Sequence, residues 1–261
     1  MKNTPTDPVP LLQDLIRCKS VTPAEGGALT YLENLLSTHG FVCQRLIFRQ
    51  EGTPDVENLF ARIGSGSPHL CFAGHTDVVP EGIVESWTHQ PFAADIADGF
   101  VYGRGATDMK GSVAAFFQSL LNVAASGPRP NHTEILFVGL IDEENMQLGS
   151  RHFAQHGPQG DLAIVGEPTG LEIVTAHKGD VWLRLRTTGR SAHGATPHRG
   201  KNAVTAMARI VLALETEYAA ELAQRIRLGS QQTFPSGGHP GDRPPTGFPS
   251  QADKGHGLRI S

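Results

Sequence analysis

The chain has 261 residues, enough for one large domain or two smaller ones, and its 39% hydrophobic and 18% charged content is ordinary for a globular protein. A formal net charge of -4 gives no electrostatic reason to expect nucleic acid or an anionic membrane as a partner. The polar first ten residues predict no secretory signal, and no apolar stretch is long enough to predict a membrane span.

Three cysteines, Cys18, Cys43 and Cys71, are scattered along the chain. Their odd number and wide spacing favour a reducing compartment over a scaffold of disulfides. The expected role of all three is that of small buried hydrophobic side chains. We therefore expect a cytoplasmic protein.

Helical and extended patterns alternate from the start of the chain. Apolar residues recur at helical spacing in 11–16 and again in 29–36, where Gly40 ends the pattern. Short extended runs then follow in the order 41–48, 58–63 and 70–73, with two further pieces on either side of a turn at Asp98-Gly99.

The alternation continues through the middle of the chain. Gly111 opens a helical pattern that closes at Gly127-Pro128, and the unbroken apolar run 135–141 predicts a buried strand. A helix near 147–155 and a strand over 162–165 follow. This order predicts an α/β domain with a mostly parallel sheet, which we place at 1–177.

The pattern changes after Gly170. Segments 172–176 and 181–187 alternate as strands do, and 202–225 is a long helical pattern, so we expect a second, smaller α+β domain over 178–228. The tail, 229–261, is rich in Gly, Pro, Ser and Gln and has no sustained apolar period. It is predicted to be disordered, because it cannot bury enough apolar surface to offset the entropy of ordering.

Four polar segments stand where α/β proteins build their sites, beyond the carboxyl ends of predicted strands. In chain order they contain His75 with Asp77, Asp108 in a glycine-rich bend, the run Asp142-Glu143-Glu144, and Glu167 before Pro168. Together they offer one imidazole and several carboxylates, a ligand set suited to zinc or a similar divalent ion. Two ions about 3.5–4 Å apart can share a bridging carboxylate and activate the water between them.

Each segment also has a plainer interpretation. Asp108 can cap the helix that follows it, and three consecutive acids can form a solvated turn. The bend 103–111 is rich in glycine, but it lacks both the Gly-Lys-Ser/Thr ending of a phosphate loop and the glycine spacing of a dinucleotide site. Phosphate binding is therefore the weakest interpretation of that bend.

The segments resemble the peptidase M20 family of di-zinc aminoacylases and peptidases. The matching stretches are 74–80, Trp87 with Pro91-Phe92, 102–111, 142–144, 166–169, 191–193 with Pro197, and 200–203. The resemblance runs from near the N-terminus to about Glu217, and motifs in this order are highly specific. It implies an α/β zinc-hydrolase domain with a mostly parallel sheet and a smaller α+β dimerisation or lid domain.

The resemblance implies four metal ligands. His75 and Glu167 belong to different ions, Asp108 bridges both ions, and Glu144 binds the second ion. Two Zn²⁺ ions per subunit are expected, with Co²⁺ as an alternative. A cis peptide bond is expected after Asp108.

Three further residues receive catalytic roles from the same resemblance. Glu143 is the general base that takes a proton from the bridging water and delivers it to the leaving amine. Asp77 orients His75. His193 stabilises the oxyanion in the partner's site across a homodimer formed by the second domain. The alternative for His193 is an exposed loop histidine.

The implied reaction is hydrolysis of the amide bond of an N-acyl amino acid. N-succinyl-diaminopimelate, on the route to lysine, is the leading substrate, and N-acetylornithine is the alternative. No nucleic acid or membrane partner is implied.

The sequence departs from the family pattern beyond the second domain. Family chains are longer, and they return to the catalytic domain with a final histidine ligand for the second metal. His239 and His256 do not match that ligand and receive no role. We therefore expect a reading frame truncated or shifted near Leu228, a doubtful second metal site, and an inactive fragment as the rival to a working enzyme.

Overall fold

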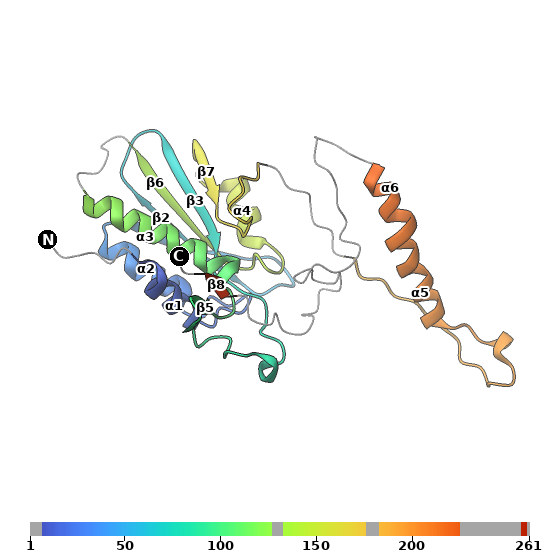
Figure 1. Cartoon of the computed structure of the whole chain (residues 1–261). Coiled ribbons are helices and arrows are strands. Elements are labelled where there is room, and N and C mark those ends of the chain that lie inside the picture. Colours follow the sequence, from blue (N-terminus) through green and yellow to red (C-terminus); the bar gives the residue numbers. More distant parts are fainter. Residues whose placement is uncertain (1–6, 127–132, 176–182, 225–256, 260–261) are drawn as a thin grey trace. The chain divides into compact units, whose positions relative to one another are not determined.

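The computed structural model describes residues 7–126, 133–175, 183–224 and 257–259 (Figure 1). Contacts divide the chain into two compact units. The first comprises Met1–Ile173 with Pro245–Ser261, and the second comprises Val174–Pro244. None of the helices in the described ranges has the length and apolar character that a membrane crossing needs.

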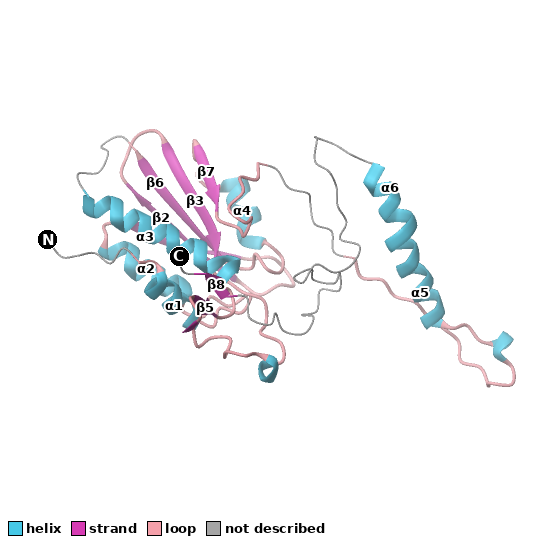
Figure 2. Ribbon diagram, in the orientation of Figure 1, coloured by secondary structure: helices cyan, strands magenta, loops and turns pink. Residues whose placement is uncertain are grey.

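A five-stranded sheet in the order β1-β2-β6-β3-β7 forms the centre of the first unit (Figure 2). Its strands are β1 (Val42–Phe48), β2 (Val56–Ile63), β3 (His69–His75), β6 (Glu134–Leu140) and β7 (Leu162–Val165). β3 pairs in parallel with β6 and β7, whereas β2 pairs antiparallel with both β1 and β6.

Four of the five strands run in the same direction, which confirms the prediction of a mostly parallel sheet. β2 runs in the opposite direction, which the sequence did not predict. The reason is the short connection between β1 and β2. A few residues can join antiparallel neighbours as a hairpin, whereas a parallel pair needs a long crossover.

Helices cover both faces of the sheet. The principal core lies between the sheet and the helices α1 (Val9–Arg17), α2 (Ala28–Thr38) and α3 (Gly111–Ser126). A smaller cluster on the other face joins Cys71, Leu136 and Val138 to Phe153 of α4 (Leu148–His156). The division follows from the strand repeat, because successive side chains of β6 point to opposite faces.

A small second sheet, in the order β4-β5-β8, belongs to the same unit. Its strands are β4 (Asp95–Ala97), β5 (Phe100–Tyr102) and β8 (Gly257–Arg259). Asp98 and Gly99 join β4 to β5 with φ values of 51° and 78°, as a tight hairpin turn requires.

β8 lies within the tail for which the composition predicts disorder. Its backbone pairs with β5, since an edge strand offers unpaired N–H and C=O groups to any extended segment. The remainder of 229–261 lies outside the described residues, and the prediction for it stays a prediction.

The second unit is largely helical in its described part. Asn202 caps α5 (Ala203–Ala213) by accepting the backbone N–H of Thr205, and a short π-helical segment, Leu214–Tyr218, continues into α6 (Ala219–Gln224). This confirms the predicted helical segment. A short 3₁₀ turn, Pro197–Arg199, precedes it.

The predicted strands over 172–176 and 181–187 are wrong for residues 172–175 and 183–187, which form no strand. An alternating pattern makes one face apolar, but a strand also needs a neighbour for its backbone groups. In the described part of this unit, the backbone forms a single isolated β-bridge, between Arg190 and Lys201. Leu183 and Leu185 accordingly remain exposed.

Candidate metal centre

His75, the last residue of β3, lies at the centre of a group of acidic side chains. Only 1% of its side chain is exposed. Its Nε2 atom lies 3.1 Å from a carboxylate oxygen of Asp108, 3.6 Å from one of Glu143 and 3.7 Å from one of Glu167. Carboxylates from three separate loops therefore converge on one ring nitrogen.

The sheet explains why residues so far apart in the sequence meet here. β3, β6 and β7 are parallel neighbours, so their carboxyl ends lie at one edge of the sheet. His75 ends β3, Glu143 follows β6 and Glu167 follows β7. Asp108 reaches the same place from the bend before α3.

Asp77 fastens the loop after β3 to the loop after β6. It is fully buried, and its carboxylate accepts the backbone N–H of Glu143 at 3.4 Å and of Glu144 at 3.2 Å. Nδ1 of His75 lies 2.9 Å from the backbone oxygen of Asp77 and 3.5 Å from its carboxylate. When Nδ1 carries the proton and donates it to this backbone oxygen, Nε2 is unprotonated. Nε2 then faces the acids as the atom that can bind a metal.

The bend that carries Asp108 is shaped by its own backbone. Gly105 has a φ of 79°, which suits glycine, and the peptide bond between Asp108 and Met109 is cis, as the family resemblance implies. Met109 is buried, and its sulfur accepts the backbone N–H of His75 at 3.3 Å. Both the side chain of Asp108 and the residue after it therefore contact His75.

The crowding of acids changes the proton affinities in the group. Burial by itself lowers the pKa of His75, but hydrogen bonds with Asp108, Asp77 and Glu167 outweigh it and raise that pKa far above its usual range. Burial is also the largest cause that raises the pKa of the Glu143 carboxyl. The centre thus favours a positive charge, either a proton on His75 or a cation in its place.

The same residues fit a divalent metal. One ligand atom each from His75, Asp108 and Glu167 lies within 4.8 Å of the other two, and a nitrogen with carboxylate oxygens is a ligand set for zinc. Three of the four predicted ligands therefore come together. Glu144 is not in this group in the described part of the chain, although its backbone is tied to Asp77.

Residues 71–241 match the family model described as peptidase family M20/M25/M40. The chain belongs to this family. Succinyl-diaminopimelate desuccinylase from Rhodopseudomonas palustris is 45% identical over 228 residues, which cover 83% of this chain and 58% of the relative. The protein of the same name from Parvibaculum lavamentivorans is 43% identical, over 84% of this chain and 57% of its own. The chain thus spans little more than half the length of these curated relatives.

Solved structures support the M20 fold. Human carnosine dipeptidase 1 matches with a TM-score of 0.52 and 20% identity, over 70% of this chain and 40% of its own. A tripeptidase from Staphylococcus aureus also matches with a TM-score of 0.52, at 18% identity, over 85% of this chain and 56% of its own.

The three consecutive acids of this M20 chain have different surroundings. Asp142 has a φ of 72°, its carboxylate accepts the backbone N–H of Leu148 and the side-chain N–H of Asn145, and its backbone oxygen accepts the N–H of Gln147. It shapes the turn into α4, whereas Glu143 faces His75. Asp142 therefore needs no cation to offset its charge, because a backbone N–H and a side-chain amide donate to its carboxylate.

Asn58 is a supporting residue that sequence reasoning missed. It is fully buried in β2, and its side-chain oxygen accepts the backbone N–H of Ile141 at 3.0 Å, directly before the acids. A Cβ atom at Gly149 would lie 2.3 Å from the same oxygen, so glycine is needed there. The available signal was an amide directly before the apolar run 59–61 of the strand.

His193 belongs to the second unit. There it is an exposed loop residue, and its Nδ1 accepts the backbone N–H of Ala195 at 3.1 Å. Its predicted role in a partner's site stays a prediction.

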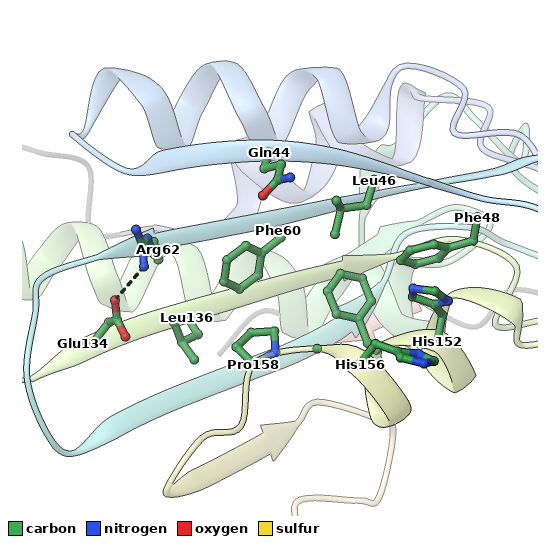
Figure 3. Close-up of a pocket in the computed structure, with 12 residues that line it drawn as sticks. Gln44, Leu46, Phe48, Phe60, Arg62, Glu134, Leu136, His152, His156 and Pro158 are labelled. Carbon is green, nitrogen blue, oxygen red and sulfur yellow. Dashed lines mark ion pairs between the residues drawn. The ribbon is translucent and has the colours of Figure 1, made fainter.

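A separate hollow of about 350 Å³ lies on the face of the sheet that carries α4. Figure 3 shows His152 and His156 of α4 beside it, with the ring of Phe48 against that of His152 and an ion pair between Arg62 and Glu134. None of the predicted metal ligands lines this hollow. The metal centre and the hollow are therefore distinct features.

Proposed function

We propose that this chain carries the catalytic framework of a metal-dependent hydrolase that removes the acyl group of an N-acyl amino acid. The observation that carries the proposal is the convergence of Asp108, Glu143 and Glu167 on Nε2 of His75, all within 3.7 Å. The names of the relatives favour N-succinyl-diaminopimelate as the substrate, in the cytoplasmic synthesis of diaminopimelate and lysine.

We propose that His75, Asp108 and Glu167 bind the first ion together, because one ligand atom of each lies within 4.8 Å of the other two. This revises the expectation that His75 and Glu167 belong to different ions. Asp108 also bridges to a weaker second site, which Glu144 completes. The donor set suits Zn²⁺, with Co²⁺ as the alternative, and two ions per subunit are proposed. When bound, such ions supply Lewis acidity toward the amide carbonyl and the attacking water. The second site is weaker because Glu144 does not join the other ligands in the described residues.

Glu143 is the proposed general base. One of its oxygens faces His75 at 3.6 Å, while the other accepts the side-chain N–H of Gln147 at 3.1 Å. This second contact holds the carboxylate with one oxygen directed into the centre. Glu143 then takes a proton from water there and passes it to the nitrogen of the leaving amine. Asp77 supports both steps by orienting His75 and the backbone of Glu143.

The second unit is proposed to form a homodimer. Its apolar side chains at Val204, Leu212 and Leu214 are exposed, and exposed apolar surface of this kind marks an interaction site. In the dimer, His193 would donate a hydrogen bond to the oxyanion that forms in the partner's site.

Zinc content and amide hydrolysis test the proposal on the purified full chain. Bound zinc with turnover of N-succinyl-diaminopimelate supports it, and turnover of N-acetylornithine instead would change the substrate. A Glu143→Gln variant is expected to keep its zinc and lose turnover by about 10²–10⁴-fold. Glu85→Gln, an equivalent change at an exposed residue, serves as the control.

A chain that holds less than one zinc ion and turns over neither substrate would overturn the proposal. That result would favour an inactive fragment that keeps the fold of the family.

A further inference from the structure

One short segment, from the last turn of α1 to Thr22, contacts both of the loops that carry His75 and Asp108. It contains none of the proposed ligands. Hydrogen bonds join it to both loops, and most of them are made by buried groups.

The first set of contacts reaches the loop after β3. The hydroxyl of Ser20 donates to the backbone oxygen of Thr76, and both residues are fully buried. The backbone N–H of Val78 donates to Ser20 at 2.9 Å, and that of Thr22 donates to Val78 at 3.0 Å. The backbone on either side of Asp77 is therefore fixed against this segment.

The second set of contacts reaches the bend before α3 through Lys110. Its side chain is fully buried, and its ammonium donates to the backbone oxygens of Leu15 and Cys18, each at 2.8 Å. These carbonyls lie at the C-terminal end of α1, where a cation is favoured by the helix dipole. A buried ammonium is costly unless hydrogen-bonded, so this side chain locks the bend to α1.

We propose that the segment 15–22 is a shared brace that sets the spacing of the metal ligands, with Lys110 and Ser20 as positioning residues. Lys110 stands two residues after Asp108, and Ser20 holds the residue next to His75. Because both loops are fixed to the same segment, the 3.1 Å separation between His75 and Asp108 depends on it. This inference rests on the proposed metal-binding function.

The test compares Lys110→Met with Lys19→Met. Both variants replace a lysine with a side chain of similar length. Lys19 belongs to segment 15–22, but its side chain is exposed, lies over the ring of Phe92 and makes none of the hydrogen bonds that join the brace to the two loops. Zinc affinity is measured by competition with a chelating dye, and the visible absorption spectrum of the Co²⁺-loaded protein reports the ligand geometry. Circular dichroism and thermal unfolding establish that each variant is folded.

Lys110→Met is expected to weaken zinc binding by about 10–100-fold, the effect typical of outer residues that orient ligands, and to change the Co²⁺ spectrum. Lys19→Met is expected to leave both unchanged. Ser20→Ala, which removes one hydrogen bond, is expected to weaken zinc binding by a smaller factor, about two- to tenfold, and it provides the test if Lys110→Met does not fold.

Wild-type protein that does not bind zinc would refute the proposed function itself. Wild-type protein that binds zinc, together with folded Lys110→Met and Ser20→Ala variants that keep its affinity and its Co²⁺ spectrum, would refute only the brace. A loss of thermal stability with an unchanged spectrum would also refute it, since that result is expected of a purely structural lysine.

Discussion

Helices α3 and α5 are equally apolar on average, yet they differ in what they bury. In the first unit, α3 buries Val113 and Phe117 against the sheet and α1. In the second unit, no residue of α5 is buried, and Val204 is 78% exposed. The comparison teaches that a helical pattern predicts the helix, whereas burial needs a partner surface that the local sequence does not describe.

All the proposed metal ligands belong to the first unit. Zinc affinity is therefore the property for which we expect substitutions in the two units to differ most. His75→Ala is expected to lower zinc affinity by at least 100-fold, because it removes the proposed ligand on which three carboxylates converge. His193→Ala is expected to keep the zinc and to reduce kcat by about 10²–10³-fold, as the loss of an oxyanion donor does. Zinc titration and kinetics on both variants check this, and equal zinc affinities would contradict it.

We also expect side-chain packing to contribute more to stability in the first unit than in the second. Phe137→Ala is expected to lower the free energy of unfolding by about 3–5 kcal/mol, since Phe137 is fully buried among Phe72, Phe116 and Phe117. Val204→Ala, measured at a protein concentration at which the chain is monomeric, is expected to change it by less than about 0.5 kcal/mol. Urea denaturation followed by fluorescence measures both, and a similar cost at the two positions in the monomer would mean that Val204 is buried within its own chain.

The exposed apolar face of α5 should serve the dimer. Leu212→Asp is expected to raise the dissociation constant of the dimer at least tenfold, which corresponds to about 1.4 kcal/mol. Zinc affinity of the first unit should stay the same. Sedimentation equilibrium at several concentrations provides the measurement, with Glu215→Gln on the following turn as a polar control. A wild-type chain that stays monomeric throughout would reject the dimer.

The start of α5 depends on a single cap. Asn202→Ala removes the hydrogen bond to the N–H of Thr205 and is expected to cost about 1 kcal/mol. The loss should be local, so amide exchange should accelerate in the first turn of α5 and remain unchanged in α3. Asn202→Ser, which keeps a capping oxygen, is expected to restore most of the protection.

The smallest expected effect concerns the cysteines, all of which lie in the first unit. Burial raises the pKa of the thiols of Cys18, Cys43 and Cys71. A raised pKa means less thiolate at a given pH, so alkylation by iodoacetamide at pH 8 should be slower than that of a free thiol and should accelerate as pH rises. Mass spectrometry after timed labelling checks this, with urea-unfolded protein as the fast reference.

Local patterns predicted most of the elements of the first unit. Helices α1, α2, α3 and α4 and the strands β1, β2, β3, β6 and β7 lie where apolar periodicity placed them, within a few residues. The candidate ligands could be selected because polar residues directly follow apolar strands, and parallel strands bring such residues to one edge. Their roles came from the resemblance to the family.

Pairing and support were decided by the tertiary structure. The reversed direction of β2, the absence of strands over 183–187, and the roles of Asn58, Ser20 and Lys110 all depend on partners far away in the chain. Lys110 bonds to Leu15, 95 residues away, and Ile141 bonds to Asn58, 83 residues away. Periodicity records which face of an element is apolar, but it holds no information about which distant backbone group will meet a buried polar side chain.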